Sequence, residues 1–252
     1  MGRAAYTRLA VVAALGTALP LSCSVDDRAL TGAGGAAGSA GSAQGNSGTG
    51  PTPEPDSSTA GAPSGPPPLP VCDYGDGVQP GCETLVNNPG FTKDASGWSP
   101  EQGSVTMSWV ADDAAGNRRS GALSVTNALS GEADGIASRG AAQCLPTTAG
   151  QAYGLAADVF IPEGQGDGLD GGSYTATAGV SVIFFTTAAC DGYTLSNATS
   201  TVIDQAGHWQ HGEGHATAPE GAQSMLVRLV TFKNFREYTF EARFDNVLVK
   251  EE

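Results

Sequence analysis

Basic residues are scarce in this sequence, which holds 12 lysines and arginines against 26 aspartates and glutamates in 252 residues. Nucleic-acid binding needs clustered Lys and Arg side chains that displace the counterions of the phosphate backbone. Here Arg118-Arg119 is the only adjacent basic pair, and the net charge is −14. The sequence therefore excludes nucleic acid as a partner, and an anionic lipid surface would also repel the chain.

Catalytic signatures are missing as well. The sequence has no GxSxG nucleophile motif, no HExxH metalloprotease motif and no glycine-rich phosphate loop. Carboxylates are plentiful but scattered, and no pair of them stands out as the two acids of a glycosidase. We therefore expect a binding protein and not an enzyme.

No hydrophobic run is long enough to cross a membrane. Residues 1–22 carry Arg3 and Arg8 and then an apolar run, Leu9 to Leu21. This run is too short for a bilayer core of about 30 Å. A basic start followed by a short apolar core is typical of an export signal, which we place at residues 1–22.

The end of this signal, Leu19-Pro20-Leu21-Ser22-Cys23, resembles the lipobox of bacterial lipoproteins, although Pro20 stands where a leucine is usual. The resemblance implies that Cys23 becomes a lipidated first residue, and Ser24 after it implies sorting to the outer membrane. The alternative is ordinary signal cleavage with an incidental cysteine. The interpretation favoured is a lipid-anchored, surface-exposed protein of the cell envelope that meets the membrane only through its anchor.

Large apolar and aromatic side chains are almost absent from Thr31 to Pro70, where Leu69 is the only one. Such a segment buries too little surface to order itself. We expect a disordered linker rich in Gly, Ala, Ser and Pro over residues 23–71, of which forty residues can stretch to roughly 130 Å. A folded domain is predicted over residues 72–252.

Cysteines are few, at five in the chain. No CxxC spacing occurs, so disulfides are favoured over a zinc site for the four cysteines after Cys23. An exported protein lies in an oxidising compartment, where disulfides persist. Of the three possible pairings we predict Cys72–Cys82 and Cys144–Cys190.

Helical periodicity is absent, and apolar residues instead alternate with polar ones from about Glu83 to the end. The alternating runs include Val105 to Trp109, Tyr153 to Ile161 and Ser224 to Phe232, whereas Val180 to Phe185 has apolar residues on both faces and is predicted to be buried on both. Short alternating runs separated by Gly, Pro, Asn and Asp turns predict an all-β sandwich.

Six motifs occur in an order that resembles a known family. They are LVNNPGF (85–91), GW (97–98), SGALSVTN (120–127), TAGQAYGLAADVFIP (148–162), HWQHGEGHATAPEGAQSMLVRLV (208–230) and FEARFDNVLV (240–249). Together they resemble carbohydrate-binding modules with the galactose-binding-like jelly-roll fold, which accompany xylan- and glucan-degrading enzymes. The resemblance implies a jelly-roll β-sandwich and a polysaccharide or glycan as partner.

A sugar site in such modules consists of aromatic rings and a few polar side chains. The resemblance places Trp98 and Trp209 in the core. The remaining candidates for ligand binding are Trp109, Tyr193, Arg228 and Phe232. In the run from Ser224, Arg228 and Phe232 face the groove if Met225, Val227 and Leu229 face the core. The alternative for each candidate is a sheet face covered by loops.

A structural calcium ion is common in the family. The resemblance implies Asn88 and Asp245 as ligands, although Thr92 replaces an acidic residue that often completes the early motif. The glycine-rich segment 163–172 resembles one calcium-binding repeat in a single copy and is more simply a solvated loop. The three histidines of HWQHGEGH are interpreted as part of an exposed polar strand.

The favoured function is that of a surface-displayed lipoprotein with a non-catalytic carbohydrate-binding domain. The alternative is an adhesion module that binds an envelope polymer or protein with the same fold and no sugar site. Few free aromatic residues favour the second interpretation, and the usual role of the family favours the first.

Overall fold

The computed structural model describes residues 66–131, 135–165, 176–234 and 239–252. The predicted export signal, Cys23, most of the tether and most of the glycine-rich segment therefore lie outside the described residues. Within the described ranges, no helix is long and apolar enough to span a membrane.

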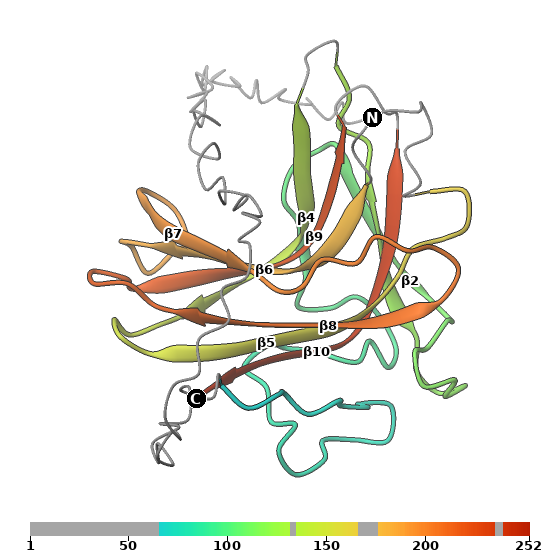
Figure 1. Cartoon of the computed structure of the whole chain (residues 1–252), viewed down its shortest axis with the longest axis horizontal. Coiled ribbons are helices and arrows are strands. Elements are labelled where there is room, and N and C mark those ends of the chain that lie inside the picture. Colours follow the sequence, from blue (N-terminus) through green and yellow to red (C-terminus); the bar gives the residue numbers. More distant parts are fainter. Residues whose placement is uncertain (1–65, 132–134, 166–175, 235–238) are drawn as a thin grey trace, which may run out of the picture. The chain divides into compact units, whose positions relative to one another are not determined.

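Ten β-strands make up the secondary structure of the described residues (Figure 1). Their bounds are β1 Ser99–Pro100, β2 Val105–Val110, β3 Ala122–Asn127, β4 Ile136–Pro146, β5 Ala152–Phe160, β6 Thr177–Phe185, β7 Thr194–Thr199, β8 Trp209–Thr217, β9 Ser224–Asn234 and β10 Phe240–Glu251. They form two five-stranded antiparallel sheets. Sheet A has the order β1-β4-β9-β6-β7 and sheet B the order β2-β3-β10-β5-β8.

The strand order is that of a jelly roll. From β3 to β10, neighbours in sequence mostly fall in opposite sheets, giving β4-β9-β6-β7 in one layer and β3-β10-β5-β8 in the other. Long connections of this kind between two antiparallel layers define the double Greek key. The predicted all-β jelly-roll sandwich is confirmed.

Alternation along each strand builds the core between the sheets. On β9, Met225, Val227 and Leu229 are fully buried and belong to the main core cluster, as predicted. On β6 both faces are largely buried, which agrees with the apolar residues that Val180 to Phe185 carries on both faces. Burial of aliphatic side chains at about 25 cal/mol per Å² provides the main stabilisation of such a core.

A β-bulge interrupts β10 between Asp245 and Leu248. Asn246 there has a φ of 51°, the left-handed conformation that Asn tolerates better than most residues. As a result Phe244, Val247 and Val249 all point into the main core, whereas Leu248 points to the outer side of sheet B.

A second, smaller cluster covers part of the outer side of sheet B. Leu69, Cys72, Tyr74 and Cys82 pack there on Ala156 and Leu248. The Leu69 backbone N–H donates to Glu213 Oε2 at 3.0 Å, so this residue, which the sequence placed in the tether, is bound to the sheet. The Tyr74 hydroxyl donates to the Cys82 carbonyl at 2.8 Å, and burial raises the pKa of the phenol to about 12.

Both predicted disulfides are present. Cys72–Cys82 closes the N-terminal loop, with a Cα–Cα distance of 5.7 Å. Cys144–Cys190 joins β4 to the turn after β6, with a Cα–Cα distance of 5.8 Å. The second bridge therefore links β4 to the turn after β6, two elements of sheet A on either side of β9.

Candidate ligand-binding face

The outer side of sheet A, called the sheet-A face below, carries a row of small side chains around one arginine. Cross-strand register places Ser99, Ala142, Arg228, Ser181 and Thr199 side by side. In the next row, Val230 lies between Gly140 on β4 and Gly179 on β6. Small residues on the neighbouring strands leave Arg228 as the dominant polar group of this face.

Arg228 is held by a carboxylate from the loop after β1. Its Nε donates to Glu101 Oε1 at 2.6 Å and its Nη2 to Glu101 Oε2 at 2.9 Å. Only 11% of the arginine side chain and 15% of the glutamate side chain are exposed. Such a bidentate pair fixes both side chains and compensates their charges. The sheet-A face thus presents oriented polar atoms without net charge at this point.

Ser181 lies next to Arg228 on β6. The residue is 2% exposed, and its Oγ has no hydrogen-bond partner among the described residues. A buried hydroxyl without a partner costs about 1–3 kcal/mol. The Oγ itself is buried, so a water molecule or ligand hydroxyl would satisfy it only by displacing the side chains that cover it.

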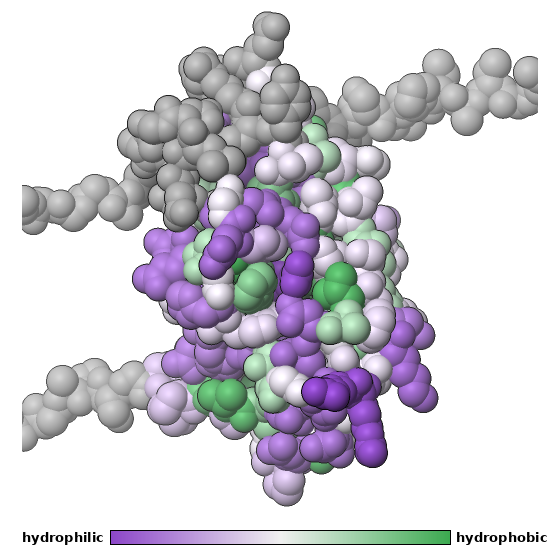
Figure 2. Space-filling model, turned by 90° about the vertical axis from the view of Figure 1, so that its right-hand side faces the viewer, coloured by the Kyte–Doolittle hydropathy of each residue, from purple (hydrophilic) through white to green (hydrophobic). Residues whose placement is uncertain are grey.

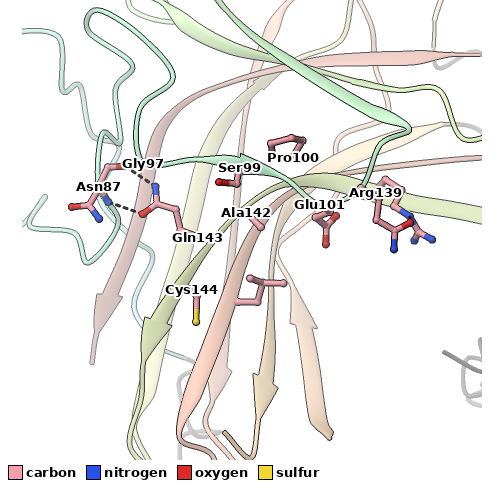
Figure 3. Close-up of a pocket in the computed structure, with 11 residues that line it drawn as sticks. Asn87, Gly97, Ser99, Pro100, Glu101, Arg139, Ala142, Gln143 and Cys144 are labelled. Carbon is pink, nitrogen blue, oxygen red and sulfur yellow. Dashed lines mark hydrogen bonds between the residues drawn. The ribbon is translucent and has the colours of Figure 1, made fainter. Parts of the chain in front are cut away.

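A hollow of about 480 Å³ lies beside this ion pair at the β1–β4 edge of the face (Figure 3). Its lining includes Ser99, Pro100, Glu101, Arg139 and Leu226. Gln143 also lines it and exchanges two hydrogen bonds with the Asn87 backbone, at 3.0 and 2.7 Å, which Figure 3 shows as dashed lines. The hollow thus combines fixed polar groups with a few apolar contacts, and none of the described residues that line it is aromatic.

The structure brings only two of the four predicted ligand contacts together. Arg228 and Phe232 lie on the outer side of β9, in the predicted orientation. Trp109 lies on β2 of sheet B, in register with the buried Leu123, and donates from Nε1 to the Phe91 carbonyl at 2.6 Å. Tyr193 is 75% exposed in the turn between β6 and β7. These two rings therefore do not join Arg228 in one groove.

One aromatic residue was placed wrongly by the sequence. Trp98 is buried in the core as expected, but Trp209 is half-buried on the outer side of sheet B, where its ring lies 5.5 Å from that of Phe160. Trp209 pairs with Phe160 in register, and Phe160 alternates with the buried Val159 and Ile161. The alternation along β5 predicts that Phe160, and with it Trp209, points outward. The family resemblance instead placed Trp209 in the core.

Exposed apolar side chains are distributed over separate elements. The large ones are Val71, Val78, Leu85, Trp109, Ile136, Tyr193 and Val202. On the face seen in Figure 2, hydrophilic residues predominate and hydrophobic ones form small separate patches. This face accordingly offers no continuous apolar area of the kind that marks a stable protein interface.

The two residues expected to hold calcium have different surroundings. Asp245 is fully buried and accepts hydrogen bonds from the backbone N–H groups of Ala114 and Asn246, at 3.0 and 2.8 Å. Burial raises the pKa of its carboxyl to about 8, and the nearby Asp113 and Asp158 add to this effect. Desolvated oxygens of this kind suit a hard cation, so Asp245 fits the role.

Asn88 fits a calcium site less well. Its Nδ2 donates to the carbonyl groups of Asp94 and Ser96, at 2.8 and 3.1 Å, which fixes the side chain to the loop that precedes β1. Within the described ranges, no three His, Cys, Asp or Glu side chains are grouped to hold a metal ion. A cation at Asp245 would therefore depend mainly on backbone and amide oxygens.

Two of the histidines each meet a carboxylate on the outer side of sheet B. His211 Nδ1 lies 2.8 Å from Asp158 Oδ1, and this contact raises the pKa of the imidazole against the opposing effect of burial. His215 Nδ1 lies 3.0 Å from the Glu252 carboxylate. Asn246 links this network to the N-terminal segment, because it donates to Asp158 Oδ2 and accepts from the Tyr74 N–H.

No family model matches the chain. No curated protein matches it either. Among solved structures, the CBM22-1 and GH10 modules of endo-1,4-beta-D-xylanase 10B from Clostridium thermocellum share 16% identity with it, at a TM-score of 0.45, over 65% of this chain and 28% of that one. The enzymatically active domain of tailspike protein 4 from bacteriophage CBA120 shares 14% identity with it, at a TM-score of 0.48, over 69% of this chain and 22% of that one.

The CBM22-2 xylan-binding domain from Paenibacillus barcinonensis shares 13% identity at a TM-score of 0.45, over 65% of this chain and 98% of that domain. The chain spans only about a quarter of the length of the first two structures. With TM-scores below 0.5, none of the three defines a ligand for this chain.

Proposed function

We propose that this protein is a lipid-anchored, surface-displayed binding protein whose β-sandwich holds a polysaccharide without cleaving it. The ligand lies on the sheet-A face, over the row that contains Arg228 and Ser181. The observation that carries this proposal is the pairing of a fixed, charge-compensated Arg228–Glu101 fork with an unpartnered hydroxyl beside it. Sugar hydroxyls both donate and accept hydrogen bonds, so they can satisfy all of these groups at once.

The charge balance of the sheet-A face indicates whether a charged or a neutral glycan would bind. Glu101 already fills the guanidinium fork, and the chain as a whole has a net charge of −14. A polyanionic polymer gains no free cation there and is repelled by the rest of the molecule. A neutral polysaccharide is therefore the expected ligand class.

The proposal is tested with the exported chain, residues 23–252, carrying Cys23→Ser to avoid lipidation. Binding is measured on a glycan array and by pull-down with insoluble polysaccharides. Ser181→Ala is the sharpest variant, because it removes one hydroxyl that has no partner among the described residues. We expect about five- to tenfold weaker binding, the loss of one hydrogen bond of about 1 kcal/mol or slightly more. The free variant should be at least as stable as the parent, because a buried hydroxyl without a partner is removed.

A matched control lies on the same sheet. Thr199→Ala alters an exposed hydroxyl at the β7 edge of the same row and is expected to change affinity much less. Saturable binding that Ser181→Ala leaves untouched would show that the ligand lies elsewhere. Binding to no glycan by the folded chain would reject the proposed function.

The second candidate is an adhesion module that binds a protein or envelope polymer with no sugar site. The absence of any aromatic ring among the described residues that line the hollow favours it. It predicts that the folded chain binds purified cell-envelope fractions after their glycans have been removed. Cell-envelope binding that disappears with the glycans supports the first candidate.

Calcium belongs to this proposal as a structural ion, with Asp245 as its carboxylate ligand. Two observations support this role. Asp245 is buried, and among the described residues its carboxylate accepts hydrogen bonds from backbone N–H groups and not from a cationic side chain. The ion would supply fixed positive charge next to the β10 bulge, while Asp245 would remain ionised at neutral pH.

A further inference from the structure

A second row of side chains crosses the outer side of sheet B, the sheet opposite the proposed ligand face. Cross-strand register aligns Trp209 on β8, Phe160 on β5, Arg243 on β10, Ser124 on β3 and Ser108 on β2. We call these five residues the sheet-B row. Neighbouring strands lie about 4.8 Å apart, so the row extends for roughly 19 Å across the sheet.

The row points away from the core at its central strands. Val159 and Ile161 on either side of Phe160 are core residues, and so are Ala242 and Phe244 on either side of Arg243. Phe160, Trp209 and Arg243 are nevertheless half-buried. Two aromatic rings and a guanidinium thus lie together, partly exposed, on the outer side of sheet B.

Phe160 contacts the two other large side chains of the row. The ring centroids of Phe160 and Trp209 are 5.5 Å apart, and the Arg243 guanidinium lies 5.3 Å from the Phe160 centroid. Contacts of this type hold aromatic rings in one orientation. The row is thus preorganised, because little side-chain freedom remains to be lost on binding.

Carboxylates beside the row compensate the arginine. Arg243 Nη1 lies 2.5 Å from Asp112 Oδ2, and Arg243 Nε lies 3.3 Å from Glu241 Oε1. Ser124 Oγ donates to the same Glu241 oxygen at 3.0 Å. With two carboxylates around one cation, the row has no excess positive charge for an anionic partner.

The neighbouring row adds an unpaired polar atom. His211, two residues after Trp209 on the same outer side, has a buried Nε2 without a hydrogen-bond partner among the described residues. Beyond it, the N-terminal segment with Leu69 and Tyr74 covers the sheet. The sheet-B row is therefore the part of this side that the described N-terminal segment leaves uncovered.

We propose that the sheet-B row binds a second strand of neutral glycan, laid across the β-strands, with sugar rings on Trp209 and Phe160 and hydroxyls on Arg243, Glu241 and Ser124. Aromatic faces with adjacent hydrogen-bonding groups match the apolar faces and hydroxyl edges of sugars. This inference rests on the proposed function but adds a second surface on the opposite sheet. With one strand on each sheet, the protein cross-links polysaccharide, so binding to a multi-strand polymer is bivalent.

The test measures stoichiometry and cross-linking separately. The exported chain with Cys23→Ser is titrated by calorimetry with the soluble form of any neutral glycan that it binds, and turbidity reports cross-linking of the polymer. Phe160→Leu and Trp209→Leu keep apolar volume and remove the ring faces. Ser181→Ala alters only the sheet-A face, and thermal unfolding shows that each variant is folded.

We expect the parent chain to bind two glycan strands and to raise turbidity. The Phe160→Leu and Trp209→Leu variants should weaken one of the two sites by about tenfold, in line with about 1.4 kcal/mol for an aromatic contact, and lower the turbidity. Glu241→Gln should weaken the same site without removing a ring. Should Phe160→Leu prove unfolded, Glu241→Gln and Trp209→Leu still test the row.

Three results overturn the inference. One glycan strand per chain, weakened only in Ser181→Ala, rejects the sheet-B row and leaves the proposed function in place. Two strands that both persist in folded Trp209→Leu and Glu241→Gln variants also reject it. No binding of any glycan by the parent chain rejects the proposed function and the sheet-B row together.

Discussion

Arginine is rare in this chain, yet each sheet carries one near the middle of its outer side. Arg228 lies on β9 and Arg243 on β10, the central strands of sheets A and B. Each is paired with a carboxylate, Glu101 for the first and Asp112 for the second. Because these pairs keep the guanidinium groups oriented and neutralised, they suit ligands that offer hydroxyls and no charge.

The Arg228–Glu101 pair can be tested by a double-mutant cycle. Arg228→Met or Glu101→Gln alone should lower the free energy of unfolding by about 2 kcal/mol, because each leaves a largely buried charge without its partner. The double variant should lose less than the sum of the two, with a coupling of about 1–2 kcal/mol. Urea unfolding at neutral pH measures all four forms, and strictly additive losses would show that the pair does not form in solution.

Asp245 gives the chain an unusual pH dependence. In the folded state the pKa of its carboxyl is raised from 3.8 to about 8. Between these values the folded protein keeps a proton that the unfolded chain has released, so stability falls as pH rises from about 4 to about 8 and is level above that. Each pKa unit corresponds to about 1.4 kcal/mol. In EDTA, the Asp245→Asn variant should lack this slope and be more stable than the parent at pH 8.5.

If calcium binds Asp245, the parent and not Asp245→Asn should be the more stable protein at pH 8.5. A bound cation stabilises the ionised carboxylate, so excess calcium should raise the stability of the parent at pH 8.5 and leave Asp245→Asn unchanged. Denaturant unfolding from pH 4 to pH 9, with EDTA or calcium, separates the two effects. A parent whose stability in EDTA does not fall between pH 5 and pH 8 contradicts the raised pKa.

Side-chain parity identifies most of the outward and inward residues from sequence. It placed Arg228 and Phe232 on the outer side of β9, and the structure agrees. The same rule puts Trp109 on the side of Val105 and Met107, toward the core, and puts Phe160 opposite the buried run of β5. Partners such as Glu101 for Arg228 come from loops remote in sequence, so no local pattern predicts them.

At the level of elements, glycines decide how closely β8 approaches the segment after β7. Gly212 and Gly214 face residues 200–201, whose Thr201 N–H donates to the Glu213 carbonyl at 2.8 Å. A Cβ atom on Gly212 would lie 2.6 Å from the Thr201 carbonyl oxygen. This contact joins the β7 side of sheet A to the β8 edge of sheet B and closes the sandwich there.

Gly212→Ala should therefore destabilise the domain by about 1–3 kcal/mol, because backbone atoms and not a flexible side chain must move. Gly103→Ala is the matched control, since a methyl group there would have nothing within 4 Å and the φ of Gly103 is not in the left-handed range. Urea unfolding compares the two variants. Equal stabilities would mean that the two edges are not in close contact.

Element positions were largely predictable, and element ends were not. Alternation and turn residues indicate the long strands β5, β6, β9 and β10, because each has a buried and a more polar side or is buried on both. The two-residue strand β1 is too short to leave a pattern. A single apolar residue at the end of the tether, Leu69, gave no periodic signal for its packing on Gly154 and its hydrogen bond to Glu213.

For the molecule as a whole, the net charge bears on the proposed lipid anchor. Cleavage before Cys23 removes Arg3 and Arg8 and no acidic residue, so the net charge changes from −14 to −14 − 2 = −16. A chain of this charge is repelled by anionic headgroups. The proposed membrane association would then depend on a lipid at Cys23, and two or more acyl chains are needed for stable anchoring.

Replacing one atom at the proposed anchor is thus expected to change where the protein is found. The parent should fractionate with membranes, resist extraction by high salt and enter the detergent phase of a Triton X-114 partition, because acyl chains and not charges hold it. Cys23→Ser should be found in the aqueous phase with the same folded domain, since Cys23 lies far ahead of the sandwich in sequence. Aqueous partitioning of the parent would instead indicate ordinary signal cleavage, and salt-extractable membrane binding by Cys23→Ser would indicate a protein partner at the envelope, the outcome that the adhesion candidate predicts.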